Sequence, residues 1–330
     1  MKEEQIRPAH MLAECTRLGQ QDREYILRRS SEFVSVPCPA CDRNTCSPEF
    51  QKDGFSFVRC PACRTLFISP RPTLQMVMDY DAQSKASAYW SEHVLPASES
   101  YRLENIFRPR AKLVAELCRE HGSDDSLLLD VGAGPGTFCL AMKETGFFKH
   151  VTAIEPSARL ADSCRRNGVH VIQEPIENAE VRSASVIASF ELIEHLFSPR
   201  EFLVTCRAAL SENGLLILTT PNVFGFDLLI LGERSGNVCG PQHLNYFHPA
   251  SLRTLLEGCG FAVVKTLTPG RLDAEIVRSQ ILRGSFNVDS QPFLKEILIE
   301  RWDELAAKLQ TFLAENGLSS HLWVVAKRCG

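Results

Sequence analysis

The chain has 330 residues, of which 44% are hydrophobic and 23% are charged, and its formal net charge is −4 at pH 7. These values are ordinary for a globular protein and exclude the fibrous, low-complexity and disordered classes. Acidic and basic residues are interspersed along the chain, so the charge offers no bulk attraction to nucleic acid or to an anionic membrane. We therefore expect a small-molecule partner and consider nucleic acid an unfavoured one.

The first residues are charged and have no apolar centre, and no apolar run is long enough to span a bilayer. We expect a cytoplasmic protein with no membrane partner. Residues 1–36 indicate one or two polar helices, a helical N-terminal extension. The chain has 13 cysteines but no secretion signal, which indicates metal ligands and buried thiols rather than disulfides. Cys118, Cys139 and Cys206 lie in predicted helices and are expected in the core.

Two identical Cys-Pro-Ala-Cys units end at Cys41 and Cys63 and are separated by residues 42–59. This is the spacing of a four-cysteine zinc ribbon, which we place at residues 37–72. The predicted ligands of a structural Zn²⁺ are Cys38, Cys41, Cys60 and Cys63, whereas the spacing of Cys46 fits worse. Acidic residues offset the basic ones here and no basic cluster appears, so we interpret the ribbon as a packing module.

The segment that follows, residues 73–120, is expected to be mainly helical. It is rich in aromatic residues, namely Tyr80, Tyr89, Trp90, Tyr101 and Phe107. Such a segment could form a lid over an active site, or its rings could simply pack the ribbon onto the next domain. We treat it as a helical linker or lid.

From residue 121 to the end of the chain, strands and helices alternate. Strands are predicted near 127–131, 151–155, 169–173, 185–190, 215–220 and 261–267, with a long helical stretch at 291–316 and a closing strand at 320–327. This alternation predicts an α/β fold with a parallel sheet covered on both faces. Ligands of such folds bind at the carboxyl ends of the strands.

A glycine-rich turn follows the first of these strands and opens a helix. Gly132, Gly134 and Gly136 allow close approach of a ligand to the backbone, and the helix start favours an anionic group. A dinucleotide fingerprint needs a sixth-position glycine, where Thr137 stands, so NAD is disfavoured. Glu155 at the end of the next strand places a carboxylate where a ribose diol could bind.

At these residues the chain resembles class I S-adenosylmethionine-dependent methyltransferases, whose first motif is an acid, one further residue and a GxGxG turn, and whose second strand ends in an acid. The resemblance covers residues 127–327. It implies a Rossmann-like seven-stranded sheet whose last strand is antiparallel and inserted between the fifth and sixth. The cofactor-binding residues that it implies are Asp130, Gly132, Gly134, Gly136, Glu155, Phe190 and Glu191.

Methyl transfer to a protonated nucleophile needs a base near the strand ends. The candidate catalytic residues are His195, His243 and Glu194, and either histidine could serve as the base. The IEH tripeptide and the QHxxYF motif resemble those of zinc-containing deoxysugar C-methyltransferases, in which these histidines transfer protons. Those enzymes carry EH where Gln242 and His243 stand here, and they have an additional C-terminal domain.

Glu191, Glu194 and His195 also match the ExxEH of ubiquinone-type O-methyltransferases, which has been associated with a divalent ion. Carbon or oxygen as the methylated atom therefore stays open. Base-amino methyltransferases are excluded, because Phe190 and Glu191 stand where their (N/D)PP(Y/F) turn would be.

The sequence thus predicts an enzyme that methylates a small hydroxylated or keto metabolite, such as a sugar nucleotide, with S-adenosylmethionine as cofactor and a structural Zn²⁺. Two alternatives stay open: a methyltransferase of rRNA or tRNA that uses the ribbon to bind RNA, and a noncatalytic scaffold with the same fold. The acceptor and the oligomeric state are not determined by the sequence.

Overall fold

The computed structural model describes residues 3–329 of the chain. Its centre is a seven-stranded sheet with the order β10-β11-β8-β7-β4-β5-β6. The strands are β4 (Leu127–Val131), β5 (His150–Ile154), β6 (His170–Ile172), β7 (Ala184–Phe190), β8 (Leu210–Pro221), β10 (Phe261–Leu267) and β11 (His321–Arg328). β4 to β8 run parallel, whereas β11 pairs antiparallel with both β8 and β10. The expected place and direction of the closing strand are confirmed.

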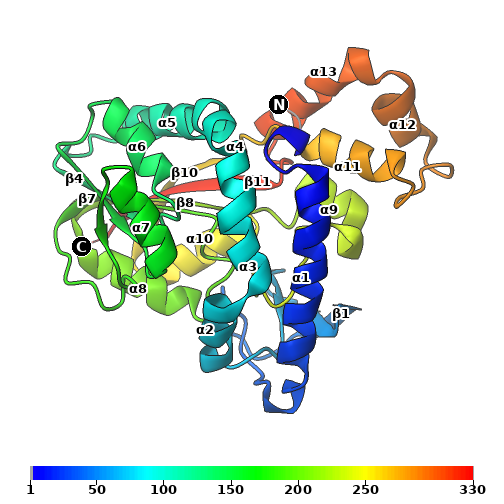
Figure 1. Cartoon of the computed structure of the whole chain (residues 1–330), viewed down its shortest axis with the longest axis horizontal. Helices are drawn as coiled ribbons and strands as arrows, with labels where there is room; N and C mark the ends of the chain where they lie inside the picture. The colour runs from blue at the N-terminus through cyan, green and yellow to red at the C-terminus, as the bar shows by residue number, and fades with distance from the viewer. Residues whose placement is uncertain (1–2, 330) are drawn as a thin grey trace.

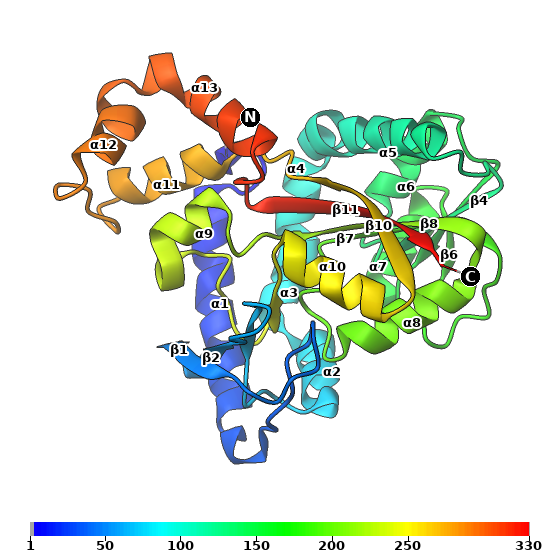
Figure 2. The same ribbon diagram turned by 180° about the vertical axis from the view of Figure 1, so that it is seen from behind.

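Helices cover both faces of this sheet (Figures 1 and 2). The helices of the sheet region are α6 (Thr137–Glu144), α7 (Ala158–Arg166), α8 (Pro199–Ala209) and α10 (Pro249–Gly258). α6 and α7 pack on one face together with α5, and α8 and α10 pack on the other. The side chains of Cys118, Cys139 and Cys206 are fully buried in these two cores, as predicted.

The N-terminal third is mainly helical apart from a small sheet. Its helices are η1 (Glu3–Gln5), α1 (Ala9–Leu27), η2 (Ser30–Glu32), α2 (Leu74–Gln83), α3 (Lys85–Tyr89), the π-helical turn η3 (Trp90–Val94), α4 (Leu95–Arg102), a second π-helical turn η4 (Leu103–Phe107) and α5 (Arg108–Glu120). The sheet contains β1 (Ser47–Lys52), β2 (Phe55–Arg59) and β3 (Leu66–Ile68). Its apolar side chains share one core with α1 and α2.

A fourth strand joins this small sheet from the second half of the chain. β9 (Asn245–Tyr246) pairs antiparallel with β3, so that Leu66 lies opposite Tyr246. Between β8 and α10 the chain also forms α9 (Phe226–Leu231) and η5 (Gly232–Arg234) before β9.

The remaining helices form a separate group beside the end of β11 (Figure 1). They are α11 (Asp273–Leu282), α12 (Pro292–Lys295), the π-helical turn η6 (Glu296–Glu300) and α13 (Trp302–Glu315). The helical stretch predicted at 291–316 is therefore present but interrupted, since Arg301 leaves helical geometry with φ −118°. A small apolar core joins α9, α11 and α13.

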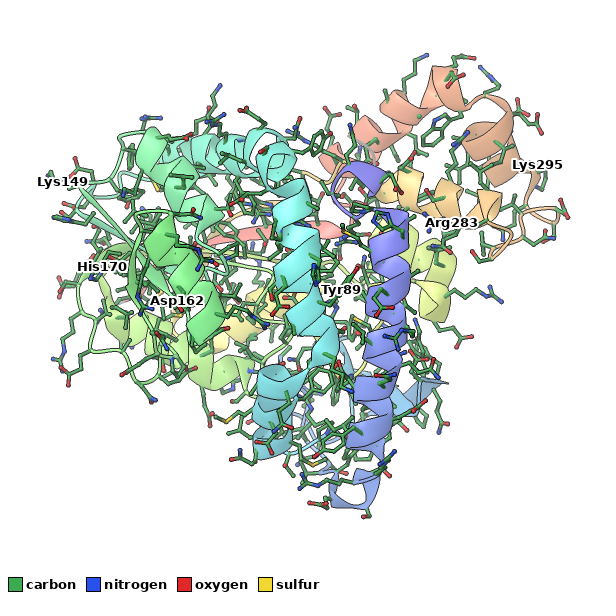
Figure 3. All side chains as sticks on the ribbon, in the orientation of Figure 1. Tyr89, Lys149, Asp162, His170, Arg283 and Lys295 are labelled. Atoms are coloured by element: carbon green, nitrogen blue, oxygen red, sulfur yellow. The ribbon has the colours of Figure 1, made fainter. Side chains whose placement is uncertain are left out.

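Figure 3 shows the length of the molecule, with Lys149 and His170 at the outer edge of the large sheet and Arg283 and Lys295 at the opposite end. Among residues 3–329, no helix combines the length and apolar composition that crossing a membrane requires.

Candidate active site

The glycine turn connects β4 to α6 and has the backbone that the sequence predicts. Gly132, Gly134 and Gly136 all have positive φ, at 75°, 57° and 80°. A Cβ at Gly132 would lie 3.0 Å from Leu192 Cδ2, and one at Gly136 would lie 3.0 Å from Cys164 Sγ. A Cβ at Gly134 would meet nothing within 4 Å. Gly134 therefore faces open space in which a ligand can approach the backbone.

Two buried carboxylates flank this turn. Glu155 follows β5, and its two oxygens accept hydrogen bonds from the backbone N–H groups of Gly134 and Ser157, each at 2.9 Å. Burial raises the pKa of Glu155, although these two hydrogen bonds oppose the shift. Asp130 accepts from Cys139 Sγ at 3.3 Å, and burial raises its pKa to about 7. The structure thus places both predicted acids beside the glycine turn.

Phe190 ends β7 and lies among aromatic rings next to the turn. Its ring centroid is 4.6 Å from that of Phe138 and 5.6 Å from that of Trp323. The guanidinium carbon of Arg110 lies 4.4 Å from the centroid of the Phe190 ring. The positive charge of Arg110 also interacts with Asp130. Arg110 belongs to no local motif, and only the packing of α5 brings it to the strand ends.

Glu191 follows Phe190 and adopts a left-handed backbone, with φ 53°. Its carboxylate accepts a hydrogen bond from Thr219 Oγ1 at 2.7 Å and lies 3.3 Å from Nδ1 of His321. His321 Nε2 accepts from Trp323 Nε1 at 2.7 Å, so Nδ1 carries the hydrogen that points to Glu191. Desolvation opposes ionisation of Glu191, but His321 and Thr219 outweigh it and lower the pKa. His321 likewise belongs to no local motif, and it reaches Glu191 only through the insertion of β11 beside β8.

The three predicted catalytic side chains meet at the ends of β7 and β8. Glu194, His195 and His243 each offer one ligand atom, and these atoms all lie within 4.8 Å of one another. Glu194 is 1% exposed; its Oε2 accepts from Thr220 Oγ1 at 2.9 Å, and its Oε1 lies 3.9 Å from His195 Nε2. Within residues 3–329, Oε1 has no hydrogen-bond partner. Glu191 is not in this group, so the structure gathers a different set from the ExxEH triplet.

Both histidine rings are oriented by backbone carbonyls. Nδ1 of His195 lies 2.8 Å from the carbonyl oxygen of Gln242, and Nδ1 of His243 lies 2.9 Å from that of Asn237. A carbonyl only accepts, so each Nδ1 carries the hydrogen and each Nε2 is left to act as a proton acceptor or ligand. The two ring centroids are 4.7 Å apart.

The pKa values of this cluster diverge. Burial and the charge of Glu191 raise the pKa of Glu194 to about 8. Burial and the charge of His243 lower the pKa of His195 to about 3. Burial also lowers the pKa of His243, but the charges of Cys239 and Glu194 outweigh it and raise the value to about 9. His243 is therefore the stronger base, and His195 stays neutral.

The loop that carries His243 is fixed to both sheets. The backbone N–H groups of Leu244 and Asn245 donate to the carbonyl of Glu194 at 2.8 and 3.1 Å. Asn245 Nδ2 donates to the carbonyl of Leu196 at 2.7 Å. On the other side, Nε2 of His248 lies 2.8 Å from the carbonyl of Cys63. β9 thus connects the histidine cluster to the cysteine units.

The four predicted cysteine ligands converge. Cys38 Sγ lies 3.4 Å from Cys63 Sγ, and Cys41 Sγ lies 3.5 Å from Cys60 Sγ. Four thiolates around one Zn²⁺ at ~2.3 Å would be roughly 3.8 Å apart, and all four sulfurs lie within 4.8 Å of one another. The two units also have the same backbone conformation after their second cysteine, since Asp42 and Arg64 both have φ 62°. Cys46 is exposed and lies outside this group.

Comparisons with known proteins agree with this geometry. A family model described as a methyltransferase domain matches residues 100–266. The ubiquinone biosynthesis O-methyltransferase of Maricaulis maris is 26% identical over 151 residues, which cover 41% of this chain and 59% of that protein. A probable S-adenosylmethionine-dependent methyltransferase of Mycolicibacterium smegmatis is 32% identical over 182 residues, covering 53% of this chain and 66% of that one.

The matched part of the chain spans 59% and 40% of the lengths of two ubiquinone-type relatives. Among solved structures, a possible histamine N-methyltransferase from Thermotoga maritima is 16% identical with a TM-score of 0.47, covering 72% of this chain and 97% of that one. The family match covers half of the chain. The chain belongs to the methyltransferase domain family, and its sheet has the strand order and the antiparallel closing strand expected for the class I S-adenosylmethionine-dependent members.

Proposed function

We propose that this enzyme methylates a small metabolite with a hydroxyl or keto group, such as a sugar nucleotide, at a carbon or oxygen atom. The observation that carries the proposal is the sheet order β8-β7-β4-β5: the glycine turn and Glu155 follow β4 and β5 on one side of β7, and β8, whose Thr220 donates to Glu194 of the histidine cluster, lies on the other. The ubiquinone-type relatives support a small acceptor, since they are named for a ubiquinone precursor pathway.

The open space at Gly134 and the acids beside it suit S-adenosylmethionine. When bound, this cofactor supplies an electrophilic methyl group on a sulfonium sulfur. In our assignment Gly132, Gly134 and Gly136 approach its methionine moiety, and Glu155 accepts hydrogen bonds from its ribose. Asp130 receives the methionine ammonium, and Arg110 binds the carboxylate. Phe190 and Glu191 then lie between the cofactor and the acceptor.

We assign His243 Nε2 as the proton acceptor. The ring is oriented through Nδ1, and the charges of Cys239 and Glu194 stabilise the imidazolium that forms. His195 stays neutral and positions the acceptor through Nε2. The Glu194, His195 and His243 set also contains the nitrogen and oxygen donors that a divalent cation accepts, which is a second use of the same atoms.

We also propose that Cys38, Cys41, Cys60 and Cys63 hold a structural Zn²⁺. Four cysteine sulfurs complete a tetrahedral shell, so this ion would have no position for a substrate or a water molecule. In this view residues 1–36 form the extension, 37–72 the ribbon, 73–120 the linker that covers the site, and 121–330 the catalytic domain.

The test is a calorimetric titration of the zinc-replete protein with S-adenosylmethionine, with NAD as control ligand. We expect binding of S-adenosylmethionine alone. Glu155→Ala should weaken it about 10- to 100-fold, because hydrogen bonds to a charged acceptor are lost. Glu174→Ala, an exposed acid beyond β6, should have no effect. If neither ligand binds, the scaffold interpretation replaces this proposal.

A further inference from the structure

A buried arginine lies near the end of the ribbon. Arg71 comes three residues after the end of β3, and only 1% of it is exposed. Its backbone N–H donates to the carbonyl of Val34 at 2.9 Å, and its carbonyl accepts from the N–H of Val34 at 2.8 Å. The residue is therefore fixed to the segment that precedes the ribbon, with its charged group away from water.

The hydrogen bonds of this guanidinium go to neutral groups. Nε donates to the carbonyl of Ile68 at 3.1 Å, and Nη1 donates to the carbonyl of Phe197 at 3.2 Å. Nη2 has no hydrogen-bond partner among residues 3–329. In the same part of the chain, no carboxylate oxygen lies within 4.0 Å of the guanidinium nitrogens. Neither the hydrogen bonds nor an ion pair therefore neutralises the charge of Arg71.

A buried cation needs an opposite charge nearby, because transfer out of water is costly for an ion. Burial lowers the pKa of Arg71 to about 10, and the negative charge of the Cys38 thiolate opposes that shift. Arg71 therefore stays positively charged at neutral pH. The opposing charge belongs to one of the four cysteines of the proposed zinc site, and this cysteine is itself 1% exposed.

The zinc site needs a positive neighbour in turn. A Zn²⁺ ion bound to four thiolates carries about two net negative charges, and the first cysteine of each unit is buried. Two other arginines of the ribbon have different contacts. Arg59 Nη2 pairs with Glu49 Oε1 at 2.8 Å, and Arg64 is exposed, with its guanidinium carbon 4.3 Å from the centroid of the Phe224 ring. Arg71, by contrast, shares the buried environment of the sulfurs.

Resting on the proposed zinc site, we propose that Arg71 is the buried counter-ion of the Zn²⁺–thiolate centre. The guanidinium offsets part of the negative charge that the four thiolates bring into the interior, and the thiolates in turn stabilise the buried guanidinium. Charges interact over longer distances in the interior than in water, so direct contact is not required. The guanidinium carbon also lies 5.7 Å from the ring centroid of Phe197, so the counter-ion packs against the segment that follows His195.

The test compares the zinc affinity of the full chain with that of three variants, by competition with a chromophoric chelator. Arg71→Gln removes the charge but keeps a hydrogen-bond donor, and we expect it to weaken zinc binding about tenfold or more, since outer-shell partners tune metal affinity by such factors. Arg71→Lys keeps the charge and should bind zinc nearly as tightly as the original protein. Arg43→Gln is the matched control, because it removes the same charge from an exposed position of the ribbon.

The two substitutions at Arg71 separate charge from packing, since both remove the planar guanidinium but only one removes the positive charge. If Arg71→Gln fails to fold in excess zinc while Arg71→Lys folds and binds the metal, the requirement for charge is also supported. Equal losses in both variants, including failure of both to fold, would assign Arg71 a packing role and overturn the proposal. Unchanged zinc affinity in Arg71→Gln would overturn it too, with the zinc site intact. If the original protein binds no zinc, the zinc site itself is wrong and the counter-ion role falls with it.

Discussion

His195 and His243 are neighbours with opposite protonation properties. Their ring centroids are 4.7 Å apart, yet the pKa of His195 is lowered to about 3 and that of His243 is raised to about 9. The difference arises from Cys239 and Glu194, which favour a charge on His243, and from that charge itself, which disfavours a second one on His195. Of the two rings, only that of His243 is therefore positively charged at neutral pH.

This difference predicts the pH dependence of catalysis. A base must be deprotonated to act, so turnover should rise with pH as His243 loses its proton and should level off above about 9. His243→Ala should lower turnover by about 100-fold or more and abolish its rise with pH, with cofactor affinity retained. Rate measurements from pH 6 to pH 10 check it, with His170→Ala on an exposed strand residue as control. If turnover of His243→Ala still rises with pH over this range, the base is another group.

The residues that sequence analysis finds are those whose chemistry shows in local spacing. Gly132, Gly134 and Glu155 lie within one strand-turn-helix unit and its following strand, so the chain order alone places them together. Arg110 and His321 are separated from Phe190 and Glu191 by long stretches of chain, and the packing of α5 and the insertion of β11 bring them close. No spacing rule shows such a contact.

At the level of elements, the β4–α6 turn combines a left-handed backbone conformation with open space beside it. Gly134 has φ 57°, and the space where a Cβ would lie is open. Gly168, in the turn before β6, has φ 66° and equally open surroundings. The two glycines therefore impose the same conformational requirement, and only Gly134 belongs to the proposed cofactor site.

A pair of alanine substitutions separates these two properties. Gly134→Ala and Gly168→Ala should each destabilise the fold by ~1 kcal/mol, because an L-residue is forced into the left-handed region. Only Gly134→Ala should also weaken S-adenosylmethionine binding, since its methyl group occupies ligand space. Thermal unfolding and calorimetry measure the two effects. Equal cofactor affinity in the two variants would show that the turn does not contact the ligand.

Element prediction succeeds where periodicity is strong and fails where elements are short. The alternating pattern after residue 127 predicts the parallel strands, and the family resemblance supplies the direction of β11. β9 has two residues and α9 has six, and neither is long enough to show a period. β9 forms because β3 offers it an unpaired edge, which is a tertiary property.

At the scale of the whole molecule, backbone hydrogen bonds and β9 connect the cysteine units to the histidine cluster. The loop with His243 is bound to Glu194 on one side and, through β9 and His248, to the ribbon on the other. Within residues 3–329, no hydrogen bond joins the glycine turn (residues 132–136) to residues 37–72. Loss of the ribbon should therefore disturb proton transfer more than cofactor binding.

Removal of the proposed Zn²⁺ tests whether the cysteine units support the histidine cluster more than the glycine turn. Chelation, or Cys60→Ser, should lower stability by more than about 3 kcal/mol, because metal binding in such modules supplies folding free energy. Turnover should fall further than S-adenosylmethionine affinity does. Cys46→Ser is the matched control, since this ribbon cysteine is exposed and outside the four-cysteine group, and it should behave as the original protein. Equal losses of turnover and cofactor affinity would contradict that expectation.

The pairing of β9 with β3 also affects the order in which the protein can be completed during synthesis. β1, β2 and β3 leave the ribosome early, but their sheet lacks its fourth strand until residues 245–246 have been made. Until then the edge of β3 is unpaired, and its exposed backbone groups could pair with another nascent chain. The small sheet is thus among the first structures begun and among the last finished.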